Sequence, residues 1–324
     1  MPSWQASVLT VAVRMLLRRR HWGDERMLAR RARRVFGAPR PLQWFRTRAV
    51  RIERADRGPM HGEWIIPERS ERGVILYFHG GGYVACSAAT DRPLTAALAR
   101  LARRRVFSLD YRLAPEHRFP AAVDDALSAY RWLLDTGVLP SALALAGTSA
   151  GGGLALGALL RIRDEGLPLP ACAACFSPWT DLTGGGASVR LNDGRCATLR
   201  PENITAFARA YLGESSPRTP YASPLFGDFD KLPPVLLQVA STELLLDDAC
   251  QVHDKIQNAG GASRLEVFDG VFHAWQMLDG FVPEARMALR RAATFLNEPA
   301  VAVQHHAERP RASIASPRSA QRER

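Results

Sequence analysis

Ser149 stands in a sequence whose residue types could support nucleophilic chemistry. The residues from Gly147 to Gly151 read Gly-Thr-Ser-Ala-Gly, after the apolar run 143–146 and before further glycines. A sharp strand-to-helix turn at this point would hold the Ser149 hydroxyl out beyond the end of the strand. Glycines on either side let the strand and the helix pass close together. This arrangement is typical of a serine nucleophile.

A serine hydroxyl is a poor nucleophile unless a base and an orienting acid assist it. His273 follows the apolar run 264–268, and Glu243 follows the apolar run 235–240. Both runs are predicted strands, so the two side chains are expected at the same edge of a sheet as Ser149. We therefore predict that Ser149, Glu243 and His273 form a catalytic triad.

The segment 79–83, His-Gly-Gly-Gly-Tyr, could stabilise a developing negative charge, because it directly follows another apolar run. Glycines let backbone N–H groups approach a substrate oxygen without an intervening side chain. We predict an oxyanion hole formed by the N–H groups of Gly81, Gly82 and Ala150. His79 is expected to fix the conformation of this loop rather than to act as a second base.

Short strands alternating with helices must position these residues. The apolar runs are short and apolar throughout, as buried parallel strands are. Their alternation with helical patterns predicts a doubly wound α/β fold with a mostly parallel sheet. The predicted strands are 74–78, 106–109, 143–146, 171–176, 235–240 and 264–268, and the predicted helices are 121–134, 150–164, 247–258 and 283–296.

Two other kinds of site fit the sequence less well. A dinucleotide-binding Gly-x-Gly-x-x-Gly motif fails because Leu156 occupies the last glycine position, and no lysine adjoins the loop for a Walker motif. Cys172 and Cys175 have the spacing of a redox or zinc pair, but they lie in an apolar run with no second pair. We therefore expect no metal ion and no cofactor.

The 324 residues are 47% hydrophobic, which is enough for one large globular domain or two smaller ones. The net charge of +11 lies at the ends: residues 1–50 carry +10, residues 301–324 carry +3, and the middle carries −2. Aromatic residues do not alternate with the basic ones, so nucleic acid is not an expected ligand. The five cysteines are odd in number and scattered, which favours a reducing compartment, the cytoplasm.

The first twenty residues predict an amphipathic helix that covers part of the domain and has an arginine-rich outer face. Reversible membrane contact through that basic face is the alternative. Arginines interrupt and follow the apolar stretch, unlike a signal peptide, and no window is long enough for stable membrane insertion. Apolar residues recur at helical spacing at Trp4, Val8, Val11, Met15 and Leu16.

Residues 62–296 resemble the bacterial hormone-sensitive-lipase-like branch of the α/β-hydrolases. The resemblance implies the α/β-hydrolase fold, with a mostly parallel central sheet, helices on both faces and a helical cap. It is carried by HGGGY at 79–83, DYRLAPEHRFPAAVDDA at 110–126, GTSAGGG at 147–153, SPWTDLT at 177–183, ELLLDDA at 243–249 and HAWQ at 273–276.

The resemblance implies a serine carboxylesterase that hydrolyses small-molecule esters with short to medium acyl chains through an acyl-enzyme intermediate. A lactone hydrolase or an N- or O-acetyl hydrolase with the same residues is the alternative. A small-molecule receptor on an inactive hydrolase fold is disfavoured, because all three triad positions are occupied. The oligomeric state, including a homodimer, is left open by the sequence.

The resemblance also implies a division of the chain. Residues 1–45 and about 184–215 would form the cap, and the catalytic domain would span 46–298. Residues 299–324 are rich in Arg, Ser and Pro and have no apolar period, so their composition predicts a disordered basic tail. Many relatives have aspartate where Glu243 stands, so Asp247 is an alternative acid; we prefer Glu243, because Asp247 fits the acidic first turn of a helix. Tyr83, Trp179, Phe207 and Tyr211 are expected either to contact the substrate or to form part of the core of the cap.

Overall fold

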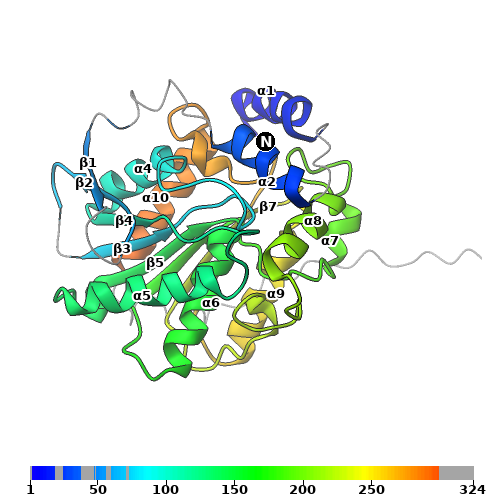
Figure 1. Cartoon of the computed structure of the whole chain (residues 1–324). Helices are drawn as coiled ribbons and strands as arrows, with labels where there is room; N and C mark the ends of the chain where they lie inside the picture. Colours follow the sequence, from blue (N-terminus) through cyan, green and yellow to red (C-terminus); the bar gives the residue numbers. More distant parts are fainter. Residues whose placement is uncertain are drawn as a thin grey trace, which may run out of the picture.

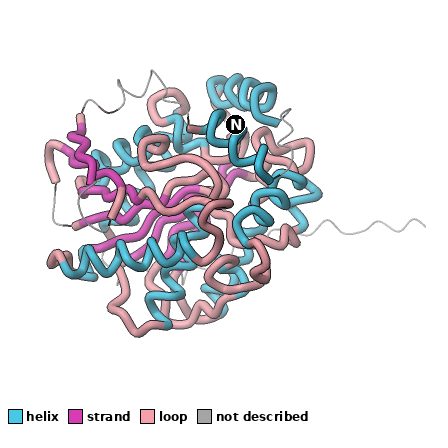
Figure 2. The backbone as a smooth tube through the Cα atoms, in the orientation of Figure 1, coloured by secondary structure: helices cyan, strands magenta, loops and turns pink. Residues whose placement is uncertain are grey.

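A single sheet of eight strands forms the centre of the computed structural model, which describes residues 2–18, 25–37, 47, 49–55, 60–70 and 73–298. The strand order is β1-β2-β4-β3-β5-β6-β7-β8. The pairs β1/β2 and β2/β4 are antiparallel, and the other pairs are parallel. Figure 2 shows the strands as a central layer between helices. They are β1 (Val50–Ala55), β2 (Gly62–Pro67), β3 (Val74–Phe78), β4 (Arg105–Leu109), β5 (Leu143–Thr148), β6 (Cys172–Phe176), β7 (Val235–Ala240) and β8 (Ser263–Phe268).

Helices cover both faces of the sheet (Figure 1). Side chains alternate along β3, so Leu76 and Phe78 pack into the core on one face, and Ile75 and Tyr77 into the core on the other. The first face is covered by α5 (Ala121–Asp135), α6 (Ala150–Asp164) and α9 (Leu246–Asn258). The second face is covered by α4 (Arg92–Ala102) and α10 (Pro283–Asn297).

The predicted α/β fold is confirmed, and each predicted strand and helix is present with bounds that differ by at most two residues. In the sheet and its covering layers, β1, β2 and α4 were not predicted. β1 lies at the edge of the sheet, where charged and apolar residues alternate and two side chains, Arg51 and Arg54, are exposed. Continuous apolar runs indicate buried parallel strands, and an edge strand of this kind contains no such run.

Further helices lie outside the two covering layers. They fall within the segments 1–45 and 184–215 that were expected to form a cap, and α2 packs against α8. Residues 38–46 and the expected tail 299–324 lie outside the described residues. These helices are α1 (Trp4–Val13), its π-helical continuation η1 (Arg14–Arg18), α2 (Glu25–Phe36), α7 (Ala187–Leu191) and α8 (Pro201–Leu212). Short 3₁₀ turns occur at η2 (Pro140–Ala142), η3 (Pro224–Phe226) and η4 (Trp275–Leu278).

The expected orientation of the N-terminal helix is wrong. Trp4, Val8, Val11 and Met15 do not cover the domain but are 50–73% exposed. The inward side of α1 instead carries the buried Ala6, with Leu9 and Val13 packed against the body. The sequence of α1 is apolar on all sides, so its periodicity does not determine which side faces the protein.

Arg14 and Arg18, two of the arginines expected on the outer face of this segment, contact the protein instead, while Arg19 and Arg20 lie outside the described residues. Both terminal nitrogens of Arg14 donate hydrogen bonds of 2.6 Å to backbone carbonyls of segment 194–199. Arg18 donates to two further carbonyls of the same segment, at 2.7 and 3.1 Å. These arginines therefore attach the N-terminal helix to the segment between α7 and α8.

Candidate active site

Ser149 occupies a tight turn between β5 and α6. Its backbone has φ 57° and ψ −120°, a conformation that side-chain-bearing residues rarely adopt. The neighbouring glycines allow this turn: a Cβ atom on Gly147 would lie 2.1 Å from the carbonyl oxygen of Gly151, and one on Gly151 would lie 2.1 Å from that of Phe78. The close approach of strand and helix therefore requires glycine at both positions.

Ser149, His273 and Glu243 form a continuous chain of hydrogen bonds. The Ser149 Oγ lies 2.9 Å from Nε2 of His273, and Nδ1 of His273 lies 2.5 Å from Oε2 of Glu243. The serine follows β5, the glutamate follows β7 and the histidine follows β8, so three carboxyl ends of parallel strands deliver them to one place. With the imidazole proton on Nδ1, Nε2 can accept the serine proton.

Asp247, the alternative acid, does not reach the histidine. Its Oδ2 accepts a 2.9 Å hydrogen bond from the backbone N–H of Ser188, and the residue lies in the first turn of α9. The structure thus places Glu243, and not Asp247, against His273.

Two groups hold the carboxylate oxygen of Glu243 that does not contact the histidine. The hydroxyl of Ser177 donates to Oε1 at 2.7 Å, and the backbone N–H of Ala240 donates to the same oxygen at 2.8 Å. The Ser177 oxygen in turn accepts a 3.2 Å hydrogen bond from the N–H of Ala274, next to the histidine. This role of Ser177 was not predicted from the sequence, where the one available signal was a polar residue directly after the buried strand β6.

Asn192 fixes the backbone of the same loop. Its side-chain amide donates to the carbonyl oxygens of Ser241 at 3.1 Å and Glu243 at 2.8 Å. Asn192 directly follows α7, so a residue of the expected cap segment helps to hold the acid in position. The sequence carries no signal for this contact, because the two segments are 51 residues apart.

Gly81 and Gly82, the predicted oxyanion-hole residues after β3, have φ 100° and 64° and line the same cavity as Ser149. A Cβ atom on Gly81 would lie 2.2 Å from the carbonyl oxygen of Ala85, so the loop conformation requires glycine there. Ala150 is the first residue of α6, where a helix presents N–H groups without intrahelical partners. These positions suit the predicted donors, whose role stays a prediction.

A buried network joins this loop to the residue before the nucleophile. The Tyr77 hydroxyl lies 2.8 Å from Oδ2 of Asp91 and 2.6 Å from Oγ1 of Thr148. The N–H of Gly80 donates to the same aspartate oxygen at 3.3 Å. Burial raises the pKa of the Asp91 carboxyl above its usual range. Asp91 thereby connects the glycine loop with the strand that carries Ser149.

His79 behaves as a structural residue. It is buried, and its ring stacks on Tyr111 with 4.2 Å between ring centroids. Burial lowers the pKa of the His79 imidazole, which favours the neutral form. Its Nδ1 lies 2.8 Å from the carbonyl oxygen of Gly80, at the start of the glycine loop.

A cavity of about 820 Å³ opens beside Ser149 and His273. Its size lies within the range that small-molecule sites commonly have. Trp179 and Phe207, two of the expected substrate contacts, line it. The remaining lining is largely aliphatic and aromatic, and residues from the N-terminal helices and the α7–α8 segment contribute Leu9, Ala12, Val13, Leu16, Leu17, Val35, Phe36, Thr198, Leu199, Asn203 and Ile204.

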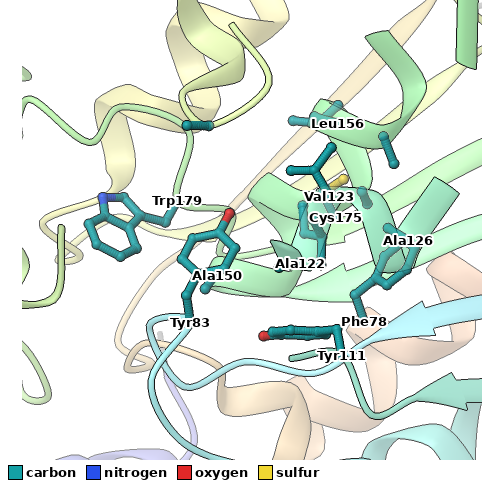
Figure 3. Packing of buried hydrophobic residues seen from close by; sticks show 14 of the residues in the cluster. Phe78, Tyr83, Tyr111, Ala122, Val123, Ala126, Ala150, Leu156, Cys175 and Trp179 are labelled. Atoms are coloured by element: carbon teal, nitrogen blue, oxygen red, sulfur yellow. The ribbon is translucent and has the colours of Figure 1, made fainter. Parts of the chain in front are cut away.

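The other two expected substrate contacts, Tyr83 and Tyr211, require correction. They are buried, lie outside the cavity lining and stack on each other with 3.8 Å between ring centroids. Tyr83 lies between Trp179 and Tyr111 (Figure 3). Both tyrosines therefore join the loop after β3 to α8 as part of the core. An aromatic residue type close to a site does not reveal whether the ring faces the cavity or the core.

A comparison of the sequence with known families agrees with this geometry. Residues 75–277 match the family described as having the alpha/beta hydrolase fold. The chain is an α/β-hydrolase. The match contains Ser149, Glu243 and His273 together with the glycine loop after β3.

Relatives of this α/β-hydrolase include proteins named as an acetyl-hydrolase and as an esterase. An acetyl-hydrolase of Streptomyces hygroscopicus is 43% identical to it over 239 residues, which are 74% of this chain and 80% of that protein. An esterase of Acinetobacter venetianus is 36% identical over 237 residues, which are 73% of this chain and 78% of that protein.

Similarity to a solved structure assigns the chain to one branch of the α/β-hydrolases. The crystal structure of an esterase from the bacterial hormone-sensitive lipase family is similar with a TM-score of 0.84 and 37% identity, covering 93% of this chain and 99% of that one. The expected membership of this α/β-hydrolase in the bacterial hormone-sensitive-lipase-like branch is therefore confirmed.

Proposed function

We propose that this α/β-hydrolase is a serine carboxylesterase with Ser149 as its nucleophile. The observation that carries the proposal is the unbroken series from Glu243 through His273 to Ser149, with distances of 2.5 and 2.9 Å, at the edge of a largely apolar cavity. The esterase and acetyl-hydrolase relatives support the same activity.

The geometry supports a two-step reaction. His273 Nε2 accepts the proton of Ser149 while the serine oxygen bonds to the ester carbonyl carbon, and the carbonyl oxygen becomes an anion. The N–H groups of Gly81, Gly82 and Ala150 would stabilise that anion. The protonated histidine then gives its proton to the leaving alcohol, which leaves an acyl group on Ser149. In the second step His273 takes a proton from water while the water oxygen bonds to the acyl carbon. When the bond between that carbon and the Ser149 oxygen breaks, the histidine returns the proton to the serine and the carboxylic acid is released.

The cavity favours uncharged esters with short to medium acyl chains. Its volume of about 820 Å³ accommodates a small molecule, and its largely apolar lining would bury an alkyl chain favourably. Trp179 and Phe207 are proposed to contact the substrate, because both line the cavity that contains Ser149.

We further propose that the cap consists of the helices in segments 1–45 and 184–215, placed on a catalytic domain of residues 46–298. Both segments contribute to the cavity wall, for example through Val13 and Ile204. Arg14 and Arg18 join them through the backbone of segment 194–199. A cytoplasmic location is proposed on the ground that all five cysteines are free thiols.

An acetyl hydrolase is the second candidate function. It is favoured by the 43% identical relative from Streptomyces hygroscopicus, which is named an acetyl-hydrolase. The same triad would remove an acetyl group from an alcohol or an amine, and a lactone would be opened by the same steps.

A fluorophosphonate probe, which labels activated serines, tests the proposed nucleophile. The wild type should be labelled and Ser149→Ala should not, whereas Ser7→Ala, an exposed serine on α1, should be labelled like the wild type. p-Nitrophenyl acetate, butyrate and decanoate, an N-acetylated amine and a lactone then separate the candidate substrates. Equal labelling of wild type and Ser149→Ala would remove the basis of the proposal.

A further inference from the structure

Helix α1 is unusual among the surface helices in having no polar face. Its ten residues, Trp-Gln-Ala-Ser-Val-Leu-Thr-Val-Ala-Val, contain no charged side chain. A helix that is apolar on all sides is normally buried or in contact with lipid. Here only one side packs against the protein, through Ala6, Leu9 and Val13.

The opposite side of α1 forms an exposed apolar stripe, which we define as Trp4, Val8, Val11 and Met15. The spacings of four, three and four residues place these side chains on one face of the helix. Their exposed fractions are 73, 57, 50 and 58%. Trp4, the most exposed of them, is the residue type that prefers the boundary between lipid and water.

The charge of this part of the chain indicates what covers the stripe. Residues 1–50 carry a net charge of +10, while the rest of the chain is close to neutral. Arg30 and Arg34 on α2 are exposed, and α2 lines the same cavity as α1. These exposed arginines attract an anionic surface to α2, which shares the wall of the cavity with α1. A second copy docked through the same stripe would bring two segments of +10 together, which disfavours self-association.

We propose that the stripe on α1 is a docking surface for anionic phospholipid bilayers. Trp4 and its neighbours would enter the region between head groups and acyl chains, with the helix parallel to the membrane plane. Among the described residues no helix is long and apolar enough to cross a bilayer, so the contact is peripheral. Docking does not depend on the proposed hydrolytic activity.

The inner side of α1 forms part of the cavity wall, directly behind the exposed stripe. Leu9 and Val13 line the cavity that contains Ser149, whereas the stripe lies on the outer side of the same helix. A docked molecule would hold one wall of its cavity directly against the lipid.

Vesicle sedimentation tests the proposal, with the inactive Ser149→Ala chain as the parent so that catalysis does not affect binding. The parent should bind vesicles of phosphatidylcholine mixed with phosphatidylglycerol, and binding should weaken at high salt and on phosphatidylcholine alone. Adding Trp4→Ser and Val8→Ser should lower the partition coefficient at least about tenfold, because two exposed apolar side chains are lost from the contact. Arg30→Glu with Arg34→Glu should also weaken binding.

The matched control replaces Leu139 and Met287 with serine, because both are exposed apolar residues outside α1. This double variant should bind vesicles like the parent. Circular dichroism, and hydrolysis of p-nitrophenyl butyrate in the active Ser149 background, should show that the α1 variants are folded. Equal loss in the control, or undiminished binding of the α1 variants, would overturn the proposal. So would sedimentation equilibrium showing a dimer that the α1 substitutions dissociate.

Discussion

The hydroxyl of Ser177 donates a 2.7 Å hydrogen bond to Oε1 of Glu243, while the other oxygen of the same carboxylate faces His273. Ser177 itself is not one of the residues that line the cavity. It is a positioning residue, because it fixes the rotation of the carboxylate and leaves Oε2 for the imidazole. It also accepts from the N–H of Ala274, so it connects the loop of the acid with the loop of the base.

Replacing Ser177 with alanine should therefore lower kcat rather than raise KM. Losing a buried hydrogen bond to a charged group costs about 1.5–3 kcal/mol, which corresponds to about 10- to 150-fold in rate if it is expressed in the transition state. Steady-state kinetics with p-nitrophenyl butyrate measures both constants. A kcat equal to that of the wild type would show that the N–H of Ala240 is sufficient to hold Oε1 of Glu243.

The assignment of the acid is tested by two isosteric substitutions. Glu243→Gln should reduce kcat by about 10³–10⁴-fold, because the amide cannot stabilise the imidazolium and can favour the wrong tautomer. Asp247→Asn is the matched control and should stay within a few-fold of the wild type, since Asp247 contacts the N–H of Ser188 and not the histidine. The opposite ranking in a kcat comparison would transfer the role to Asp247.

The Tyr77 hydroxyl links Asp91 to Thr148 behind the active site, so Tyr77→Phe should weaken both structure and activity. Removing it leaves buried polar partners without this hydrogen bond, at a cost of about 1–3 kcal/mol in the free energy of unfolding. We expect kcat to fall about tenfold, because the glycine loop loses part of its support. Urea unfolding and steady-state kinetics measure the two effects. An unchanged free energy of unfolding would contradict this reading of the network.

Asp248 makes stability depend on pH. It is fully buried, its Oδ2 accepts from the N–H groups of Thr180 and Asp181, and burial raises its pKa to about 8. The unfolded chain loses this proton near its ordinary pKa of about 3.9. Between about pH 4 and about pH 8 the folded state binds more protons at this site, so its contribution to the free energy of unfolding declines as pH rises.

Asp248→Asn should remove that contribution, because the amide oxygen can still accept both N–H bonds and carries no titrating proton. Urea unfolding near pH 5 and near pH 8 is expected to give a smaller decline for Asp248→Asn than for the wild type. Equal declines in the two proteins would show that Asp248 is ionised in the folded state.

Much of the fold was predictable from the sequence, because buried parallel strands are short apolar runs and the covering helices follow a clear period. β6 and α9 are examples, whereas β1 was missed because an exposed edge strand alternates with charge. The grouping of Ser149, Glu243 and His273 was also predictable, since parallel strands bring their carboxyl ends to one edge. The inward side of α1 was not, because a helix that is apolar on all sides has no distinguishing face.

Contacts that depend on how separate loops meet were beyond the sequence. Ser177 and Asn192 hold Glu243 through hydrogen bonds, although they are 66 and 51 residues away from it in the sequence. Neither residue type by itself predicts such a role. Tyr83 and Tyr211 show the reverse case, since their aromatic character suggested substrate contact while the structure stacks them in the core.

The hydrogen bonds from Asn192 to the backbone of the acid loop limit how this enzyme can be re-engineered. Grafting a homologous lid segment to change selectivity would exchange Asn192 together with the walls of the cavity, and could slow turnover for reasons unrelated to substrate fit. A chimera that keeps Asn192 and begins its foreign sequence after this residue separates the two effects. The cap segment that can be exchanged without disturbing the acid is therefore shorter than the segment 184–215 that contains its helices.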